Sequence, residues 1–251
     1  MVFHPGLYPQ IGVQGAIVSP PPSSSITPLT YSPTVWYKPS GFNCSGACSN
    51  GNQVSTWADS SGNANTLTLS GSGSSCTYNT GQLNGFAGLT NTNCVGTFGT
   101  AITWATSITV FAVFSHATLG GDNMAFISGA TNPYFVHRID TSTLHQTIVI
   151  PGVAVVGTGT ATLAASTFYQ INASYTSGTG AYILRAASAA DGSGTNAHSI
   201  TSSDTGTFKD IGSGNDLFNG VLIELLVYKP ALTGTQINNI EAYYRSTYGI
   251  L

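Results

Sequence analysis

An apolar run near the end of the chain predicts a strand that is covered on both of its faces. Residues 221–228 are Val, Leu, Ile and Tyr, and Glu224 alone interrupts them. A run without regular polar alternation is typical of a strand inside a sandwich of two sheets.

A short helix is predicted directly after this strand. Thr233 and Gln236 have the spacing of a capping box, in which each side chain bonds the backbone amide of the other residue. Apolar side chains then recur on one helical face, at Ile237, Ile240 and Tyr244. Gly249 stands where helices commonly end in a left-handed residue, so the helix is expected to dock beside the sheet.

Further strands are predicted at a regular spacing along the middle of the chain. The strongest is Ser107 to Ser115, and the others are residues 124–128, 134–140, 144–150, 168–175 and 181–187. Strands that recur about every ten residues, with Gly, Asn and Ser between them, are typical of antiparallel sandwiches. The segments 158–165 and 188–214 are expected to be exposed loops.

The first 33 residues are expected to form an N-terminal arm outside the folded domain, which then covers residues 34–251. They contain seven of the eleven prolines and no Asp, Glu, Lys or Arg, so neither a helix nor a central strand suits them. Two interpretations are open: a linker without fixed structure, or an arm that docks on a neighbouring subunit. The side chains expected to anchor such an arm are Phe3, Leu7, Tyr8, Ile11 and Val18.

Two segments also resemble a known family. The first is Trp57-Ala58-Asp59-Ser60-Ser61-Gly62-Asn63, and the second extends from Phe218-Asn219-Gly220 through Ala231-Leu232-Thr233 to Tyr248-Gly249-Ile250. Both are similar to elements of concanavalin A-like lectin/glucanase domains of the laminin-G-like type. The resemblance implies an all-β fold, a jelly-roll β-sandwich of two antiparallel sheets with a short C-terminal helix, and it leaves the ligand open.

The low charge of the chain argues against two classes of partner. Charged residues make up 6% of the sequence, against roughly 25% in average proteins. With six Lys and Arg and a net charge of −3, the chain lacks the basic footprint of a protein that binds nucleic acid or an anionic membrane. No stretch reaches the ~18 apolar residues of a membrane helix, and no secretory signal is visible.

The four cysteines lie in segments rich in Gly, Ser and Asn, which favours disulfides over metal ligands. Of the three pairings we favour Cys44 with Cys48 and Cys76 with Cys94, because each closes a local loop; the sequence alone leaves the other two open. Disulfides favour a location on a virion surface or outside the cell. The lack of a visible signal is then explained by its removal before the numbering begins, or by release of phage particles through lysis.

The Trp57 segment also suggests one cofactor. Its turn carries Asp59, Asn63 and Asn65, whose oxygens suit Ca²⁺, although one carboxylate is few for a tight site. We favour the structural alternative, in which Asp59 bonds backbone amides of a turn with positive φ at Gly62 and Asn63. No other cofactor is indicated.

The sequence offers little for catalysis, and we expect the protein not to be an enzyme. A glycosidase needs two facing carboxylates, but only two Glu are present, and the alternating Glu-Asp-Glu motif of glucanases in the resembled superfamily is absent. Glu224 is expected to be a structural carboxylate bonded to a turn or a Tyr, and Glu241 a solvated helix residue. The five His show no metal-ligand spacing, and no Gly-x-Ser-x-Gly elbow accompanies them.

One predicted strand, residues 134–140, mixes aromatic and charged side chains. On an open face, Tyr134, His137 and Arg138 would stack on and hydrogen-bond a sugar; the alternative is an ordinary half-buried strand. Asp122 and Asn123, in the preceding Gly-rich turn, have the same two interpretations.

These observations predict binding or structure rather than catalysis. Laminin-G-like domains often serve as carbohydrate- or protein-recognition modules, so the resemblance implies a recognition role. The leading prediction is a surface component of a phage virion, a capsid decoration or tail-associated adhesion protein. It would contact host glycan and assemble through its arm, as a homo-oligomer or with other virion subunits. The alternative is a secreted or cell-surface bacterial carbohydrate-binding module.

Overall fold

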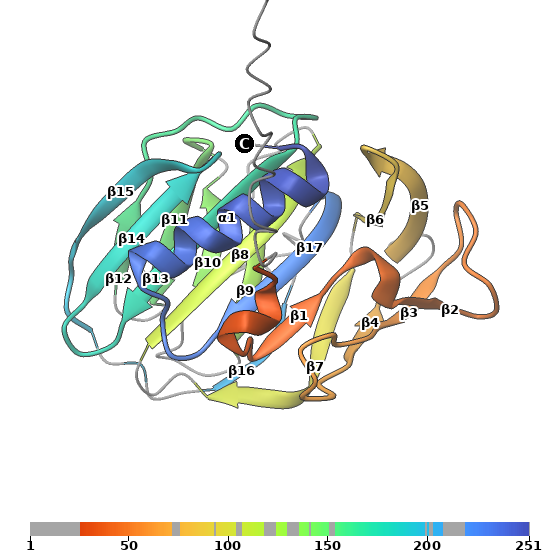
Figure 1. Cartoon of the computed structure of the whole chain (residues 1–251), viewed down its shortest axis with the longest axis horizontal. Coiled ribbons are helices and arrows are strands. Elements are labelled where there is room, and N and C mark those ends of the chain that lie inside the picture. The colour runs from red at the N-terminus through yellow and green to blue at the C-terminus, as the bar shows by residue number, and fades with distance from the viewer. Residues whose placement is uncertain are drawn as a thin grey trace, which may run out of the picture.

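The strands of the described residues form two antiparallel sheets that pack face to face, with one α-helix on the outside (Figure 1). This computed structural model describes residues 26–71, 76–92, 94–103, 107–117, 124–129, 136–140, 142–150, 154–198, 200, 203–207 and 219–250. The predicted all-β sandwich with a C-terminal helix is therefore confirmed. The anchor residues Phe3, Leu7, Tyr8, Ile11 and Val18 lie outside the described residues.

The first sheet is built around the apolar strand β17. Its order is β15 (Ala189–Thr195), β14 (Ala181–Ala186), β13 (Tyr169–Thr176), β8 (Ser107–His116), β17 (Gly220–Tyr228), β6 (Phe86–Asn91) and β5 (Cys76–Leu83), with β1 (Val35–Tyr37) also paired to β17. β17 and β8 pair from Gly220 opposite His116 to Tyr228 opposite Thr109. The two segments with the strongest apolar pattern thus lie side by side.

The second sheet has one strand more than the first and covers its inner face. Its order is β12 (Ala154–Thr158), β11 (His145–Ile150), β10 (Val136–Asp140), β9 (Met124–Gly129), β16 (Ser203–Thr207), β7 (Val95–Thr103), β4 (Leu67–Ser70), β3 (Val54–Trp57) and β2 (Phe42–Cys44). A 3₁₀ turn, η2 (Pro39–Gly41), connects β1 to β2 and so carries the chain from one sheet to the other.

Apolar side chains fill the space between the sheets. On β8, alternate residues enter this core: Ile108, Val110, Ala112 and Phe114. The aromatic rings of Tyr37, Trp57 and Phe98 pack together at one end of it. Burial of each such large side chain stabilises the fold by roughly 1.5–3 kcal/mol, so this core is the main source of stability.

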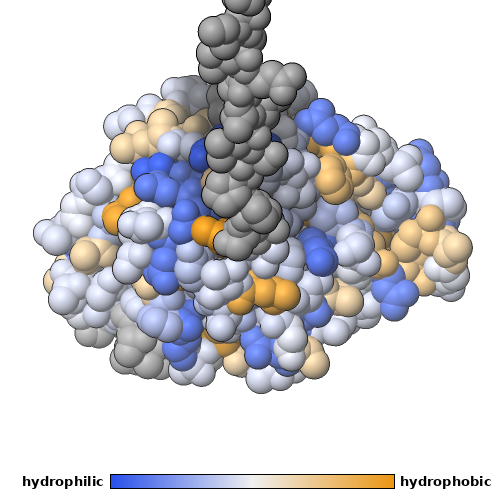
Figure 2. Space-filling view, in the orientation of Figure 1, coloured by the Kyte–Doolittle hydropathy of each residue, from blue (hydrophilic) through white to orange (hydrophobic). Residues whose placement is uncertain are grey.

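The helix α1 (Gly234–Tyr248) covers the outer face of the first sheet (Figure 1). Its buried face, which includes Ile237, Ile240 and Tyr244, packs against Phe111 and Val113 of β8 in a second apolar core. Its predicted ends are confirmed: the Thr233 and Gln236 side chains form the capping box, and Gly249 has φ 66°. On this side of the molecule, hydrophobic residues form small separate patches among hydrophilic ones (Figure 2).

A β-bulge in β17 places Glu224 under this helix. The register against β8 shifts between Leu222 and Glu224, and Ile223 lies in the helix-side core while Leu222 and Leu225 lie in the inner core. The Glu224 carboxylate is fully buried. It accepts hydrogen bonds from the indole of Trp36 at 2.8 Å and from the hydroxyl of Tyr248, which makes it the structural carboxylate that the sequence predicted.

The prediction that Glu241 is solvated is wrong. Glu241 is 1% exposed and lies between α1 and the first sheet. Its carboxylate accepts hydrogen bonds from Arg185 Nε at 2.6 Å and Nη2 at 2.8 Å and from Asn172 Nδ2 at 2.9 Å. A buried carboxylate with a bidentate guanidinium partner avoids most of the cost of losing its water.

The predicted loop 188–214 is also partly wrong, because it contains two strands. β15 pairs with β14, and β16 lies between β7 and β9 in the second sheet. Both strands are rich in Gly, Ser, Thr and Asp, which have low strand propensity. Pairing with well-formed neighbours outweighs that propensity here.

The short 3₁₀ helix η1 (Pro28–Tyr31), within the predicted arm, packs against the folded domain. Pro28 is buried, and its carbonyl accepts a hydrogen bond from the Tyr228 hydroxyl at 2.9 Å. The Tyr31 hydroxyl accepts one from Asn239 of α1 at 2.6 Å. The last part of the predicted arm is therefore attached to the sandwich.

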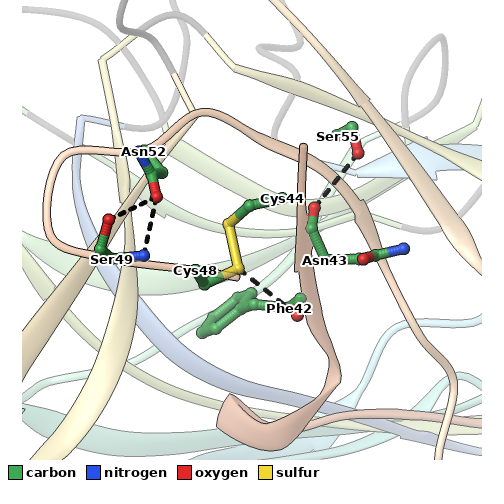
Figure 3. Close-up of a disulfide and its surroundings, with 7 residues drawn as sticks. All are labelled: Phe42, Asn43, Cys44, Cys48, Ser49, Asn52 and Ser55. Atoms are coloured by element: carbon green, nitrogen blue, oxygen red, sulfur yellow. Dashed lines mark hydrogen bonds between the residues drawn. A yellow bond between two sulfur atoms is a disulfide. The ribbon is translucent and has the colours of Figure 1, made fainter. Parts of the chain in front are cut away.

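The two favoured disulfides are both present, and none of the four cysteines is free. Cys44 and Cys48 close a small loop at the tip of β2, which the Ser49 and Asn52 side chains support (Figure 3). Cys76 and Cys94 join β5 of the first sheet to the segment that enters β7 of the second. Among the described residues, the structure has no helix whose length and hydropathy would let it cross a membrane.

Candidate functional site

The two residues of β10 that the sequence predicted to bind sugar, His137 and Arg138, lie on opposite faces of its sheet. His137 is fully buried beside Phe126, inside the sandwich. Arg138 is partly exposed on the other face, and its Nε donates to Thr147 at 3.3 Å. The other three predicted residues, Asp122, Asn123 and Tyr134, lie outside the described residues.

His137 belongs to a buried polar chain rather than to an open surface. Its Nε2 lies 3.1 Å from Oε1 of Gln146, and Nε2 of Gln146 donates to the Asp191 carboxylate at 2.6 Å. Asp191 also accepts from the backbone amides of Thr160 and Ala161. Burial lowers the pKa of His137 to about 4, against smaller opposing effects of Gln146 and Asp191, so the ring is neutral at pH 7.

In the turn for which the sequence suggested Ca²⁺, the side-chain oxygens accept hydrogen bonds from other groups of the protein. Both Asp59 oxygens accept hydrogen bonds, from the backbone amides of Trp36, Ser61 and Asn65 and from the Ser61 hydroxyl. The side chain of Asn65 bonds both the amide and the carbonyl of Thr100 on β7. Positive φ falls at Gly62 (93°) and Ala64 (54°) rather than at Asn63. Within the described ranges, no three His, Cys, Asp or Glu side chains gather where they would hold a metal ion.

An uncharged pocket of about 460 Å³ lies where β8 ends and β17 begins. Residues from five segments line it: Gln82, Thr90, Thr92, Ser115, His116, Ala117, Ser166, Phe168, Asn219, Gly220 and Val221. Amide and hydroxyl side chains line its wall, and the half-buried Phe168 supplies an aromatic ring. No Asp, Glu, Lys or Arg lines this pocket.

Close backbone contacts fix the shape of the uncharged pocket. A Cβ at Gly220 would lie 2.1 Å from the Ser115 carbonyl oxygen, so only glycine allows β17 to approach β8 here. The backbone of His116 accepts a hydrogen bond from the amide of Ser166 at 2.8 Å, and its ring lies 3.2 Å from the Leu163 carbonyl oxygen. The loop that carries Ser166 and Phe168 is thereby held against the end of β8.

Sequence reasoning missed this pocket because its residues share no local motif. Gln82, Phe168 and Asn219 come from three distant segments, and each is unremarkable in its own context. The one local signal was Gly220, which belongs to the Phe218-Asn219-Gly220 part of the family resemblance. The structure explains that glycine by the close approach of two strands.

A second depression lies beside the Asp59 turn. It consists of two adjoining pockets of about 240 and 410 Å³ that share Thr34, Asn63 and Lys229. Its walls are η1, the Asp59 turn and the end of β7. We call it the Lys229 groove.

Comparisons with known proteins show likeness in structure alone. No protein-family model matches the chain, and no curated protein sequence matches it. The binding domain of Paraclostridial Mosquitocidal Protein 1 superposes with a TM-score of 0.60 at 12% identity, over 75% of this chain and 49% of that one. Domain 4 of AbnA, a GH43 extracellular arabinanase from Geobacillus stearothermophilus, superposes with a TM-score of 0.56 at 16% identity, over 73% and 92%.

The receptor-binding domain of botulinum neurotoxin D gives a TM-score of 0.59 at 10% identity, over 86% of this chain and 53% of that one. The chain thus matches about half the length of each toxin domain. At these identities the likeness shows the fold alone, a jelly-roll β-sandwich.

Proposed function

We propose that this protein is a non-catalytic glycan-recognition domain whose sugar site is the uncharged pocket between β8 and β17. The observation that carries the proposal is the lining of the pocket. It combines side-chain amides and hydroxyls with the aromatic ring of Phe168 and contains no Asp, Glu, Lys or Arg side chain. Sugars without charged groups present hydroxyls for such amides and an apolar face for such a ring.

In this proposal each group has a separate task. The Phe168 ring packs against the apolar C–H face of one sugar residue. The amides of Gln82 and Asn219 each offer a donor and an acceptor, which suits neighbouring sugar hydroxyls. Because the pocket is held by backbone contacts, little conformational entropy is lost when a sugar binds.

The fold comparisons support the same class of function. The AbnA domain was solved in complex with arabinotriose, and the two toxin domains are named for binding, one of them for a receptor. These ligands belong to those proteins. The resemblance to laminin-G-like domains adds further support, and we propose membership of that superfamily.

We also propose that the protein is not an enzyme. Both Glu residues are buried in structural contacts, Glu224 with Trp36 and Tyr248 and Glu241 with Arg185. A glycosidase would need two carboxylates facing the sugar, and none lines the uncharged pocket. Release of reducing sugar from a glycan panel by the purified protein would contradict this proposal.

Two locations are candidates for where this protein acts. The disulfides favour an oxidising, extracellular setting, which suits both a phage virion surface and a bacterial secreted module. We propose the virion surface, on the basis of the apolar, Pro-rich N-terminal segment. Neighbouring capsid or tail genes would support it, whereas neighbouring polysaccharide-degradation genes would favour the secreted module.

The sugar site is tested by the variants Phe168→Ala and Asn219→Ala. We expect each to weaken binding of the best neutral oligosaccharide from a glycan array by about tenfold or more, because each removes a direct contact. Isothermal titration calorimetry would measure the affinity, and melting temperatures would show that the variants stay folded. The matched control is Ile183→Ala, which removes an exposed apolar side chain on β14, outside the pocket lining. An array without a neutral ligand, or unchanged affinity in both variants, would contradict the proposed site.

The assembly role of the N-terminal segment is tested by two deletions. Removal of residues 1–25 should leave the melting temperature nearly unchanged but abolish oligomerisation or particle attachment, measured by light scattering and by co-sedimentation with particles. Removal of residues 1–33 should in addition lower the melting temperature, because it deletes the buried Pro28 and the Tyr31 contact with α1. Assembly of the shorter deletion at the level of the full chain would contradict the role.

A further inference from the structure

The Lys229 groove differs in chemistry from the uncharged pocket. Its lining is again rich in hydroxyls and amides, from Ser32, Thr34, Ser61, Asn63, Asn65, Thr100 and Thr103. Leu29, which is 51% exposed, and Pro33 add an apolar side. The one charged side chain that lines the groove is Lys229, and it lines both of the adjoining pockets.

The walls of the groove are fixed by hydrogen bonds between the segments that form them. The Asn63 amide donates to the carbonyls of Pro33 and Thr34, each at 3.0 Å. The Asn65 side chain joins the same turn to Thr100 of β7 with two bonds of 2.8 Å. The turn, the start of β1 and the end of β7 therefore form one rigid cradle around Lys229.

Lys229 is distinct among the cations of the described residues. Arg185 pairs with Glu241, Arg245 donates to Ser188, Arg138 donates to Thr147, and the Lys38 amine lies 4.2 Å from the centre of the Trp36 ring. Within the part of the chain that the structure describes, Lys229 alone has no hydrogen bond, ion pair or ring contact of its side chain. Asp59 does not line the groove, and its carboxylate accepts hydrogen bonds from Trp36, Ser61 and Asn65.

We propose that the Lys229 groove is a second saccharide site, and that it takes a sugar carrying a carboxylate. The Lys229 ammonium would bond the carboxylate, since charge-assisted hydrogen bonds are about twice as strong as neutral ones. The surrounding hydroxyls and amides would bond the sugar hydroxyls, and Leu29 with Pro33 would contact its apolar face. This inference rests on the groove alone and does not depend on the uncharged pocket.

The single cation also selects against other anions. A polyanion such as nucleic acid needs several Lys or Arg along its backbone, and the chain has a net charge of −3. A phosphate group is best matched by several donors together, such as a guanidinium fork or a nest of backbone amides, whereas the groove offers no Arg and only the single point charge of Lys229. One ammonium beside many neutral hydrogen-bonding groups matches one carboxylate on a polar sugar.

The test compares acidic oligosaccharides with their methyl esters, which keep the sugar and remove the charge. The probes are trigalacturonate, a glucuronate-containing trisaccharide and a sialylated trisaccharide, each with its ester, titrated by calorimetry into the full-length protein. We expect at least one acid to bind about tenfold more tightly than its ester. Raising the salt concentration should reduce this preference.

The variant Lys229→Gln should abolish the preference for that acid and leave binding of the ester unchanged. The matched control, Lys38→Gln, makes the same change in net charge elsewhere and should keep the preference. Competition by inorganic phosphate at the same concentration would show a general anion site and would overturn the proposal. Equal affinities for acid and ester throughout the panel, or a preference that survives in Lys229→Gln, would overturn it too. Phe168→Ala should not affect acid binding, so failure of the uncharged pocket and failure of this groove are distinguishable.

Discussion

Between pH 4.5 and 6.5 the two fully buried groups that titrate in this range, Glu224 and His137, should leave the free energy of unfolding nearly constant, because their effects oppose each other. Burial raises the pKa of Glu224 from 4.5 to about 7, although hydrogen bonds from Tyr248 and Trp36 limit the rise. Burial lowers the pKa of His137 from 6.5 to about 4. Each shift changes the free energy of unfolding with pH, and the two windows overlap.

The sign for Glu224 follows from its raised pKa. The folded protein binds the Glu224 proton more tightly than the unfolded chain does. Its stabilising contribution is therefore fully present below pH 4.5 and is lost as the pH rises through about 7. From pH 4.5 to 6.5 this loss is about 2 kcal/mol.

The sign for His137 is the reverse. The unfolded chain binds this proton more tightly, because charging the imidazole inside the sandwich would place a cation beside Phe126 in the core. The stabilising contribution is present above pH 6.5 and is lost as the pH falls through about 4. From pH 6.5 to 4.5 this loss is also about 2 kcal/mol, which offsets the gain from Glu224.

Two variants that replace a titrating side chain with a neutral amide separate the effects. In Glu224→Gln the amide still accepts from Trp36, and the free energy of unfolding should fall by about 2 kcal/mol between pH 6.5 and 4.5, since only His137 titrates. In His137→Gln the free energy of unfolding should rise by a similar amount between pH 6.5 and 4.5, since only Glu224 titrates. Urea unfolding at four pH values, with the disulfides intact, would measure both slopes. Slopes equal to that of the unmodified protein would show that neither buried group titrates as described.

The fold was predictable from sequence wherever the apolar pattern was strong and local. β8 and β17 have long runs of Val, Ile, Leu and Phe, and the capping box and Gly249 defined α1. β15 and β16 could not be predicted in this way, because their Gly and Ser residues form strands only through pairing with β14, β7 and β9. There the tertiary partner, absent from any local window, determines the conformation.

Predictions of side-chain roles were right or wrong for a similar reason. Asp59 was correctly assigned to a turn, since its partners Ser61 and Asn65 are close in sequence. Glu241 was wrongly assigned, because its partner Arg185 is 56 residues away and reaches it only when α1 docks on the sheet. His137 and Arg138 are adjacent in sequence, but strand alternation sends one side chain into the core and the other outward.

The uncharged pocket could not be derived from sequence at all. Its lining residues meet because β8 and β17 pair in one particular register, with Gly220 opposite His116. That register brings Asn219 near the loop of Phe168 and near Gln82 on β5. Neutral amides and hydroxyls also leave no sequence signal in a chain where such residues are abundant.

Loss of the Cys76–Cys94 disulfide should lower the free energy of unfolding by about 3 kcal/mol, more than loss of the Cys44–Cys48 disulfide. In the chain-entropy description, the cost of opening a loop grows with its length. The two loops have sequence separations of 18 and 4, which correspond to about 3 and about 2 kcal/mol. The longer bridge also ties β5 to the segment that enters β7, and both its cysteines are fully buried, so its removal loses apolar packing as well.

The comparison uses two double variants, Cys76→Ala with Cys94→Ala and Cys44→Ala with Cys48→Ala, each unfolded in guanidinium chloride. The second variant is the matched control, because it removes a disulfide within one small loop and leaves the Cys76–Cys94 bridge intact. Alkylation of the unmodified protein without reductant should label no thiol, as detected by mass spectrometry.

Gln82 and Thr90 of the uncharged pocket lie on β5 and β6, inside the loop that Cys76 and Cys94 close. The first variant should therefore also weaken binding of the neutral sugar, whereas the control should not. Equal losses of stability in the two variants would contradict the structural role of the longer bridge, and a labelled thiol would contradict the oxidised state.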